Sequence, residues 1–221
     1  MGPVSPEELD TLLASTLEKV PPQGDVRRSR WDGAPLAQPR YGQFEVVTRS
    51  RASKVISVWP SPGACDRTDA AWDVVAAYLG DKAKGPLYER LICAGLVHDF
   101  QVGHTSRQWG GFLKMEMITR GNVDPSRVVD EVKRTIEGLA HNPLPSHLVI
   151  HYALRSFREL KAHLGQALHR ASFASAAELY FSEVPRYEDP VDPSHVGAIW
   201  RRLAGEPGSQ LFIKPQGTGS D

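Results

Sequence analysis

Four residues of types that bind substrates or transfer protons gather in one short stretch, GPLYERLICAGLVHDF, at residues 85–100. Tyr88 and Arg90 lie in a segment that predicts a helix, and His98 and Asp99 lie in the strand-like segment that follows it. A phenol and a guanidinium donate hydrogen bonds, while an imidazole both donates and accepts them. The stretch suggests a substrate-binding set; the alternative is polar decoration of an ordinary helix and strand.

A second candidate is a pair of histidines four residues apart, His147 and His151, in HLVIH. On a helix this spacing brings two imidazoles to one face, where they can share a metal ion. Leu148 stands where a zinc peptidase of the H-E-x-x-H type has its glutamate, so the pair lacks a general base. No third or fourth ligand is evident, and we expect an exposed histidine pair that binds no metal.

The composition limits the classes of function. The 221 residues include 26 Lys plus Arg and 26 Asp plus Glu, so no net charge attracts nucleic acid or an anionic membrane. No apolar run approaches the length of a membrane span, and MGPVSPEELD lacks the segments of a signal peptide. Cys65 and Cys93 match no metal or redox spacing. These features predict a cytoplasmic protein that binds neither nucleic acid nor membrane.

The chain divides by local pattern. SPEELDTLLASTLEKV predicts a helix, because Ser5 and Glu8 form a capping box before a leucine-rich face. A stretch rich in proline and glycine follows, and strand and helix patterns begin after it. The predicted divisions are an N-terminal helix, a linker or arm, a compact domain and a tail, over residues 1–20, 21–41, 42–215 and 216–221.

Within the compact domain the pattern predicts the order β-β-α-α-β-β-α-α-α-α-β. FEVVTR with KVISVWP, and VHDFQV with GFLKMEMIT, predict two adjacent strand pairs. Asp124 before Pro125 predicts a capped helix, FASAAELYFS predicts a short helix, and SQLFIKP predicts the last strand. We therefore predict an α+β fold of two layers, an antiparallel-leaning mixed sheet with helices packed on one face.

The order of these elements resembles the pitrilysin/insulinase family of zinc metallopeptidases, which includes the mitochondrial processing peptidase. More narrowly, LYERL followed by GLVHDF is similar to the second, non-catalytic domain of that family. There a helix with a Leu-Tyr/Phe-x-x-Leu-Arg pattern turns at Gly-Leu into a strand beginning Ala-Tyr-x-Val. The Ser-Pro-Glu-Glu-Leu helix resembles the last helix of the preceding catalytic domain, so the likeness covers nearly the whole chain.

The resemblance also implies which chemistry this chain lacks. The family holds zinc with H-x-x-E-H, and none of the eight histidines forms that motif. In active relatives the second domain contributes an arginine and a tyrosine to substrate binding; Ile92 and His98 occupy those positions here. Ile92 cannot donate a hydrogen bond, whereas His98 can. We expect no cofactor in this chain and zinc in a partner chain.

The resemblance implies a catalytically silent domain that pairs with a zinc-bearing H-x-x-E-H subunit to form a peptide-processing chamber. The sheet face or edge near residues 98–120 would bind substrate peptide as an added strand. Two alternatives stay open. One is a structural subunit, like the core proteins of the mitochondrial cytochrome bc complex; the other is a divergent metallopeptidase that uses His147, His151 or His98.

Overall fold

The computed structural model describes residues 5–17, 19, 41–49, 52–64, 66–107, 110–121, 123–166, 169–172 and 190–216. They belong to two units, Met1–Gln38 and Pro39–Asp221. Helix α1 (Pro6–Leu17) is in the first unit. Its capping box is confirmed, because the Glu8 amide donates to the Ser5 hydroxyl at 3.1 Å and the Glu8 carboxylate accepts from the Ser5 amide at 2.9 Å.

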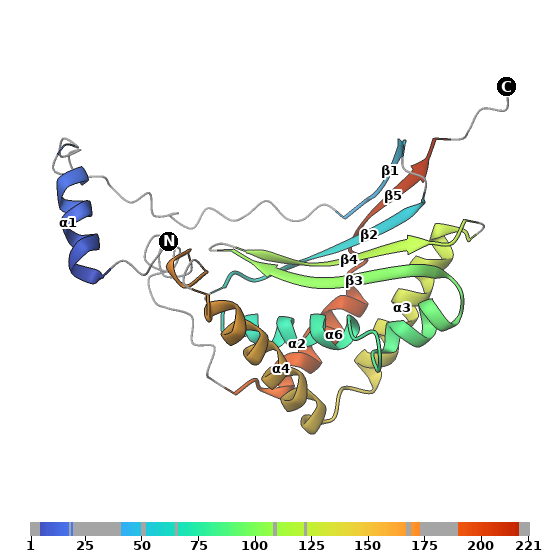
Figure 1. Cartoon of the computed structure of the whole chain (residues 1–221). Helices are drawn as coiled ribbons and strands as arrows, with labels where there is room; N and C mark the ends of the chain where they lie inside the picture. Colours follow the sequence, from blue (N-terminus) through green and yellow to red (C-terminus); the bar gives the residue numbers. More distant parts are fainter. Residues whose placement is uncertain are drawn as a thin grey trace. The chain divides into compact units, whose positions relative to one another are not determined.

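The second unit is built on a five-stranded sheet with the strand order β1-β5-β2-β4-β3 (Figure 1). The strands are β1 (Gln43–Thr48), β2 (Lys54–Ser61), β3 (Val97–Ser106), β4 (Gly111–Thr119) and β5 (Ser209–Pro215). β1 and β5 run parallel, and the other neighbours are antiparallel. The predicted mixed, antiparallel-leaning sheet is confirmed.

The prediction that β1 and β2 form an adjacent pair is wrong, because β5 lies between them. Gln210 of β5 is in register with Gln43 on one side and with Ser57 on the other. A strand pattern in the sequence shows which faces are apolar but not which strand supplies the hydrogen bonds along each edge. The second predicted pair, β3 with β4, is correct.

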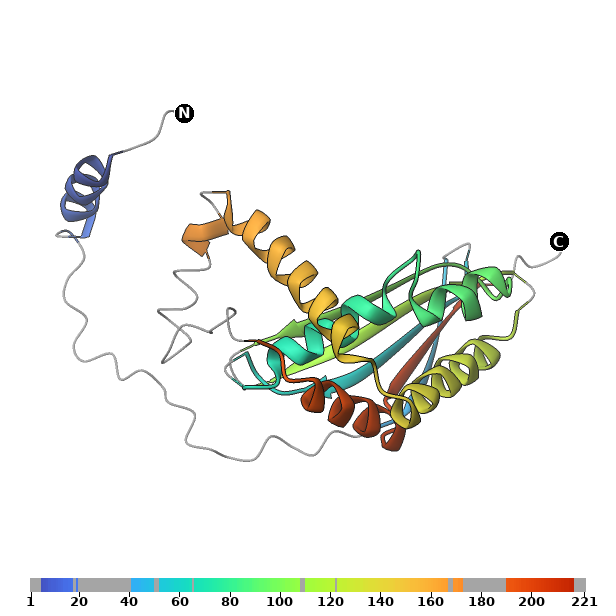
Figure 2. The same ribbon diagram turned by 90° about the horizontal axis from the view of Figure 1, so that it is seen from below.

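The helices of this unit gather on one face of the sheet (Figures 1 and 2), which confirms the predicted two layers. They are α2 (Asp69–Leu79), the π-helix η1 (Tyr88–Cys93), α3 (Pro125–His141), α4 (Ser146–Leu164) and α6 (Pro193–Gly205). The helix predicted for FASAAELYFS, most of the predicted linker and tail, and Cys65 lie outside the described residues.

Alternating strand residues and one side of each helix form the core between the two layers. On β4 Leu113, Met115 and Met117 are fully buried, as the alternating pattern predicts. Trp72 of α2 and Trp200 of α6 are the largest fully buried side chains. Burying a large apolar side chain contributes roughly 1.5–3 kcal/mol, so these layers hold each other in place.

Local signals fix where the elements begin and end. Asp124 caps α3, and its carboxylate accepts from the Ser126 amide at 3.0 Å; Asp192 caps α6 in the same way. Gly95, at φ 71°, ends the helical segment before β3 in a left-handed conformation that suits glycine. The abrupt change from helix to strand in GPLYERLICAGLVHDF is therefore a feature of the fold.

Asp81, in the turn after α2, links that turn to α4. Its carboxylate accepts from the Ala83 and Lys84 amides at 2.8 and 3.0 Å, and from the Tyr152 hydroxyl at 3.0 Å. It also pairs with Arg155 at 3.2 Å. Burial and the hydrogen bond to Asp81 raise the pKa of Tyr152 to about 12, so the phenol stays protonated as a donor.

Asp81→Ala should lower the free energy of unfolding by roughly 2–3 kcal/mol, because it leaves several donors without their shared acceptor. Urea denaturation measures this change. Asp130, exposed on α3, provides the control, and Asp130→Ala should change stability by less than about 0.5 kcal/mol. Equal losses in the two variants would mean that Asp81 does not hold α4 to the turn.

Candidate functional site

The structure separates the residues that the sequence suggested as a substrate-binding set. Arg90 is exposed on η1, and its Nη1 lies 3.5 Å from Oε2 of Glu131 on α3. Tyr88 is half-buried and packs against the core. Arg90 thus has an acidic partner on α3, whereas Tyr88 contributes to packing.

The other two candidates lie on β3. His98 is exposed, and Asp99 pairs with Lys82 from the turn after α2. The hydrogen bond from Lys82 holds the pKa of Asp99 below its usual range, so this carboxyl stays ionised. No hydrogen bond, ion pair or ring contact joins any two of Tyr88, Arg90, His98 and Asp99. Their role in substrate binding stays a prediction.

β3 is an edge strand of the sheet, and among the described strands it pairs with β4 alone. A register shift between Val97 and Asp99 places a β-bulge at His98, and bulges redirect a side chain and interrupt the pairing. His98, Gln101 and Gly103 are exposed along this strand. The edge therefore presents backbone groups and polar side chains that another extended segment can meet.

A second polar group, which the sequence analysis did not single out, is buried where α2 meets β2 and β3. The Nδ1 atom of His104 lies 2.8 Å from Oδ1 of Asp73, and its Nε2 lies 2.9 Å from Oγ of Ser61. The imidazole stacks on Trp72, with 6.0 Å between ring centroids, and is 2% exposed. In the neutral tautomer Nδ1 donates to Asp73, and Nε2 accepts from Ser61.

A carboxylate, an imidazole and a hydroxyl bonded in this order also form the catalytic triad of serine hydrolases, in which the imidazole is the base for the serine nucleophile. Ser61, however, is 8% exposed and does not line the cavity described below. We therefore interpret Asp73, His104 and Ser61 as a buried network that joins α2 to the sheet. The sequence held one signal for this acidic region: Asp69 and Asp73 are four residues apart, and so lie on one helical face.

Asp69 is incompletely paired in this region. Its side chain is 8% exposed, and Oδ2 accepts from the Ser106 hydroxyl at 3.3 Å. Oδ1 is buried with no hydrogen-bond partner among the described residues, and it lies 3.9 Å from Nε2 of His104. Burial raises the pKa of Asp69 to about 6, and the negative charge of Asp73 adds to the rise.

The raised pKa makes stability depend on pH. At a pH between 3.8, the ordinary pKa of an aspartate, and about 6, folded Asp69 holds a proton that the unfolded chain has released. This contribution to stability is therefore present at low pH, is lost as pH rises through that window, and stays lost above it. An asparagine at this position keeps the shape and cannot ionise.

Asp69→Asn should therefore be more stable than the natural chain near neutral pH, by roughly 1–3 kcal/mol, and about equal to it near pH 4. Thermal or urea unfolding across this pH range measures the difference between the two proteins. Parallel stability curves, with no extra loss in the natural chain on raising the pH, would contradict a raised pKa at Asp69.

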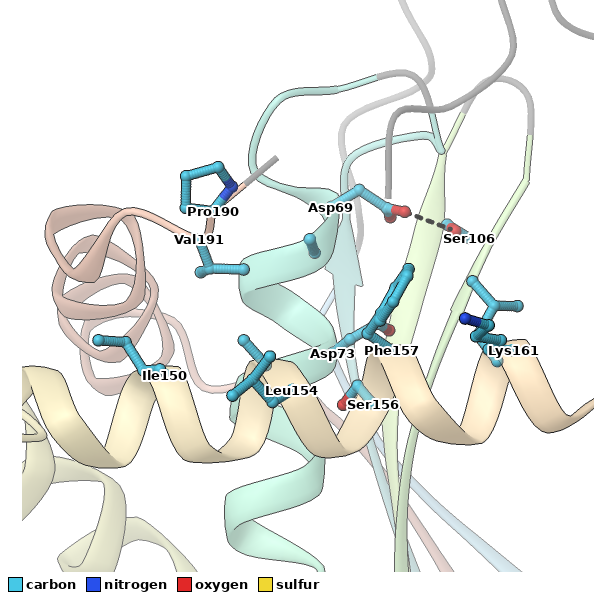
Figure 3. A pocket seen from close by; sticks show the side chains of 13 residues that line it. Asp69, Asp73, Ser106, Ile150, Leu154, Ser156, Phe157, Lys161, Pro190 and Val191 are labelled. Carbon is cyan, nitrogen blue, oxygen red and sulfur yellow. Dashed lines mark hydrogen bonds between the residues drawn. The ribbon is translucent and has the colours of Figure 1, made fainter. Parts of the chain in front are cut away.

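Asp69, Asp73 and Ser106 line a cavity of about 670 Å³ between α2, α4 and residues 190–191 (Figure 3). The figure shows Asp69 joined to Ser106 by a hydrogen bond, with side chains of α4 along the facing wall. The apolar part of the lining includes Ile150, Leu154, Phe157, Leu160 and Val191. The cavity is thus acidic where α2 begins and apolar along α4.

The described residues offer no zinc site. No three or more of their His, Cys, Asp and Glu side chains are grouped so as to hold a metal ion. His147 and His151 are both exposed on α4. Nor is any helix in the described ranges both long and apolar enough to cross a membrane.

The five-stranded sheet with helices on one face defines a two-layer α+β domain. A family model described as "Peptidase M16 inactive domain" matches residues 1–152. The chain therefore belongs to this family, which confirms the predicted relation to a non-catalytic peptidase domain. A search of curated proteins found no match.

Solved structures share the fold. A protease from Helicobacter pylori superposes with a TM-score of 0.69 at 13% identity, over 78% of this chain and 44% of that one. An inactive peptidase domain from Bordetella parapertussis superposes with a TM-score of 0.64 at 15% identity, over 79% of this chain and 100% of that one. A chain of Complex III2 from Candida albicans superposes with a TM-score of 0.69 at 10% identity, over 79% of this chain and 46% of that one. This chain thus spans less than half the length of the Helicobacter protein.

Proposed function

We propose that this chain is the catalytically silent part of a two-part peptidase, in which a separate H-x-x-E-H subunit or domain carries the zinc. Membership of the inactive-domain family supports this role. So does the lack of a metal-ligand group among the described residues, since a peptidase of this kind needs two histidines, a glutamate ligand and a base. This chain would then act on the substrate by binding it.

The edge of β3 that pairs with no other described strand carries the proposal for peptide binding. An extended peptide adds to such an edge by backbone hydrogen bonds, and nearby side chains select its sequence. His98 bulges from this edge and can donate a hydrogen bond to a peptide carbonyl. Asp99, paired with Lys82, lies beside it on the same strand, and Arg90 and Tyr88 lie on the helical segment just before the strand.

A structural role is the second candidate. Complex III2 from Candida albicans contains a chain of the same fold. A subunit of that kind would use its surface for assembly and would not need to bind free peptide at β3. Peptide binding at β3 therefore separates the two candidates.

A mixture of unstructured peptides should slow amide hydrogen exchange in β3, Val97–Ser106, because strand addition occupies its outward-facing backbone groups. β1, the other edge of the same sheet, serves as the internal control and should exchange at an unchanged rate. His98→Ala should weaken binding by about fivefold, the loss of one hydrogen bond. Unchanged exchange in β3 at saturating peptide would favour the structural role.

A further inference from the structure

The cavity between α2 and α4 has the size and the lining of a small-molecule site. Its volume of about 670 Å³ falls within the roughly 300–1,000 Å³ typical of ligand sites. Two large aliphatic side chains of its α4 wall are exposed to solvent, Ile150 to 55% and Leu154 to 49% of their surface. Phe157 and Leu160 continue the same wall. An apolar chain lying against α4 would bury this surface.

One carboxylate oxygen in the acidic part of the lining has no hydrogen-bond donor among the described residues. The side chain of Asp69 is more than nine-tenths buried, and its Oδ1 atom has no hydrogen-bond partner among the described residues. A buried carboxylate oxygen without a donor is costly, so a ligand that supplies one gains more than it would at the surface. Asp73 lines the same region and is 39% exposed, which leaves it accessible to a ligand.

The neighbouring groups do not supply that donor. Nε2 of His104 is 3.9 Å from Oδ1 of Asp69 and is already bonded to Ser61. Lys161 of α4 is the one basic residue among the described residues of the lining, and it forms no ion pair with either aspartate there. Apart from His104, no basic group among the described residues pairs with Asp69 or Asp73, and both carboxylates lie beside an apolar wall.

We propose that this cavity binds an aliphatic primary ammonium group, with the nitrogen at Asp69 and Asp73 and the chain against the apolar wall of α4. The ammonium supplies three donors and a positive charge, which the two carboxylates and the Ser106 hydroxyl can accept. This chemistry occurs in a free alkylamine and in the side chain of lysine. The proposal does not depend on peptide binding at β3.

Octylamine, octanol and octanoate provide a matched test, because they share the chain and differ in the polar end. NMR titration of the full chain should show octylamine binding at least about tenfold more tightly than octanol, the difference expected for charge-assisted hydrogen bonds. Shifted resonances should belong to the cavity lining. Octanoate binding as tightly as octylamine, through Lys161, would overturn the proposal, as would no binding by octylamine.

Variants separate the charge from the wall. Asp69→Asn should weaken octylamine binding by about tenfold and leave octanol unchanged, because only the ammonium uses the carboxylate. Asp130→Asn on α3 is the control and should leave both unchanged. Leu154→Gln, at a half-exposed wall position, should weaken both ligands alike. Equal octylamine affinity in Asp69→Asn and the natural chain would overturn the assignment.

The pH dependence gives a further readout. Asp69 faces Asp66 and Asp73, His104 from β3 and, across the cavity, Lys161 from α4. An alkylamine stays protonated throughout the range in which Asp69 ionises. Octylamine should therefore bind more tightly as pH rises from about 5 to about 7, and this change should disappear in Asp69→Asn. A pH dependence that persists in the variant would contradict the assignment of the nitrogen to Asp69.

Competition identifies the source of the ammonium group. A short peptide with an acetylated N-terminus and one lysine should displace octylamine if the cavity takes a lysine side chain, and its Nε-acetylated form should not, because acetylation removes the last ammonium charge. Octylamine binding without displacement by the peptide would support a small amine as the ligand. Displacement by both peptides alike would overturn recognition of the ammonium.

Discussion

The sheet depends on its last strand. β5 lies between β1 and β2 and pairs with both, so the sheet is discontinuous until the C-terminal segment is in place. β1 has no other partner among the described strands. α6, which leads into β5, buries Trp200 in the core, so helix packing and strand insertion reinforce each other. Pairing between such distant segments is a non-local step of folding.

β3 lies at the edge of the sheet opposite to β1, and both proposed sites involve this strand. The outer edge of β3 pairs with no other described strand and has a bulge at His98. The C-terminal end of β3 brings His104 and Ser106 to α2, where they meet Asp73 and Asp69. The proposed peptide edge and the acidic cavity therefore belong to the same strand but use different atoms, so each can be altered without the other.

Patterns within one element were readable from the sequence. The alternation in GFLKMEMIT and the Asp-Pro start of α3 depend on local periodicity and capping, and both are confirmed. The place of β5 was not readable, because a strand pattern does not name its neighbour. His104 was missed because its partners come from α2 and β2, and only the folded register joins them. Arg90 and Asp99, predicted as one set, have different ion-pair partners.

The proposed silent role is tested most directly by recovering the tagged full chain from its native host and identifying what comes with it. We expect a stoichiometric partner that carries H-x-x-E-H, with zinc present in the complex and none bound by this chain after separation. Recovery without such a partner would contradict the two-part peptidase. One tightly held zinc ion on the separated chain would also contradict it, and would point to a divergent metallopeptidase.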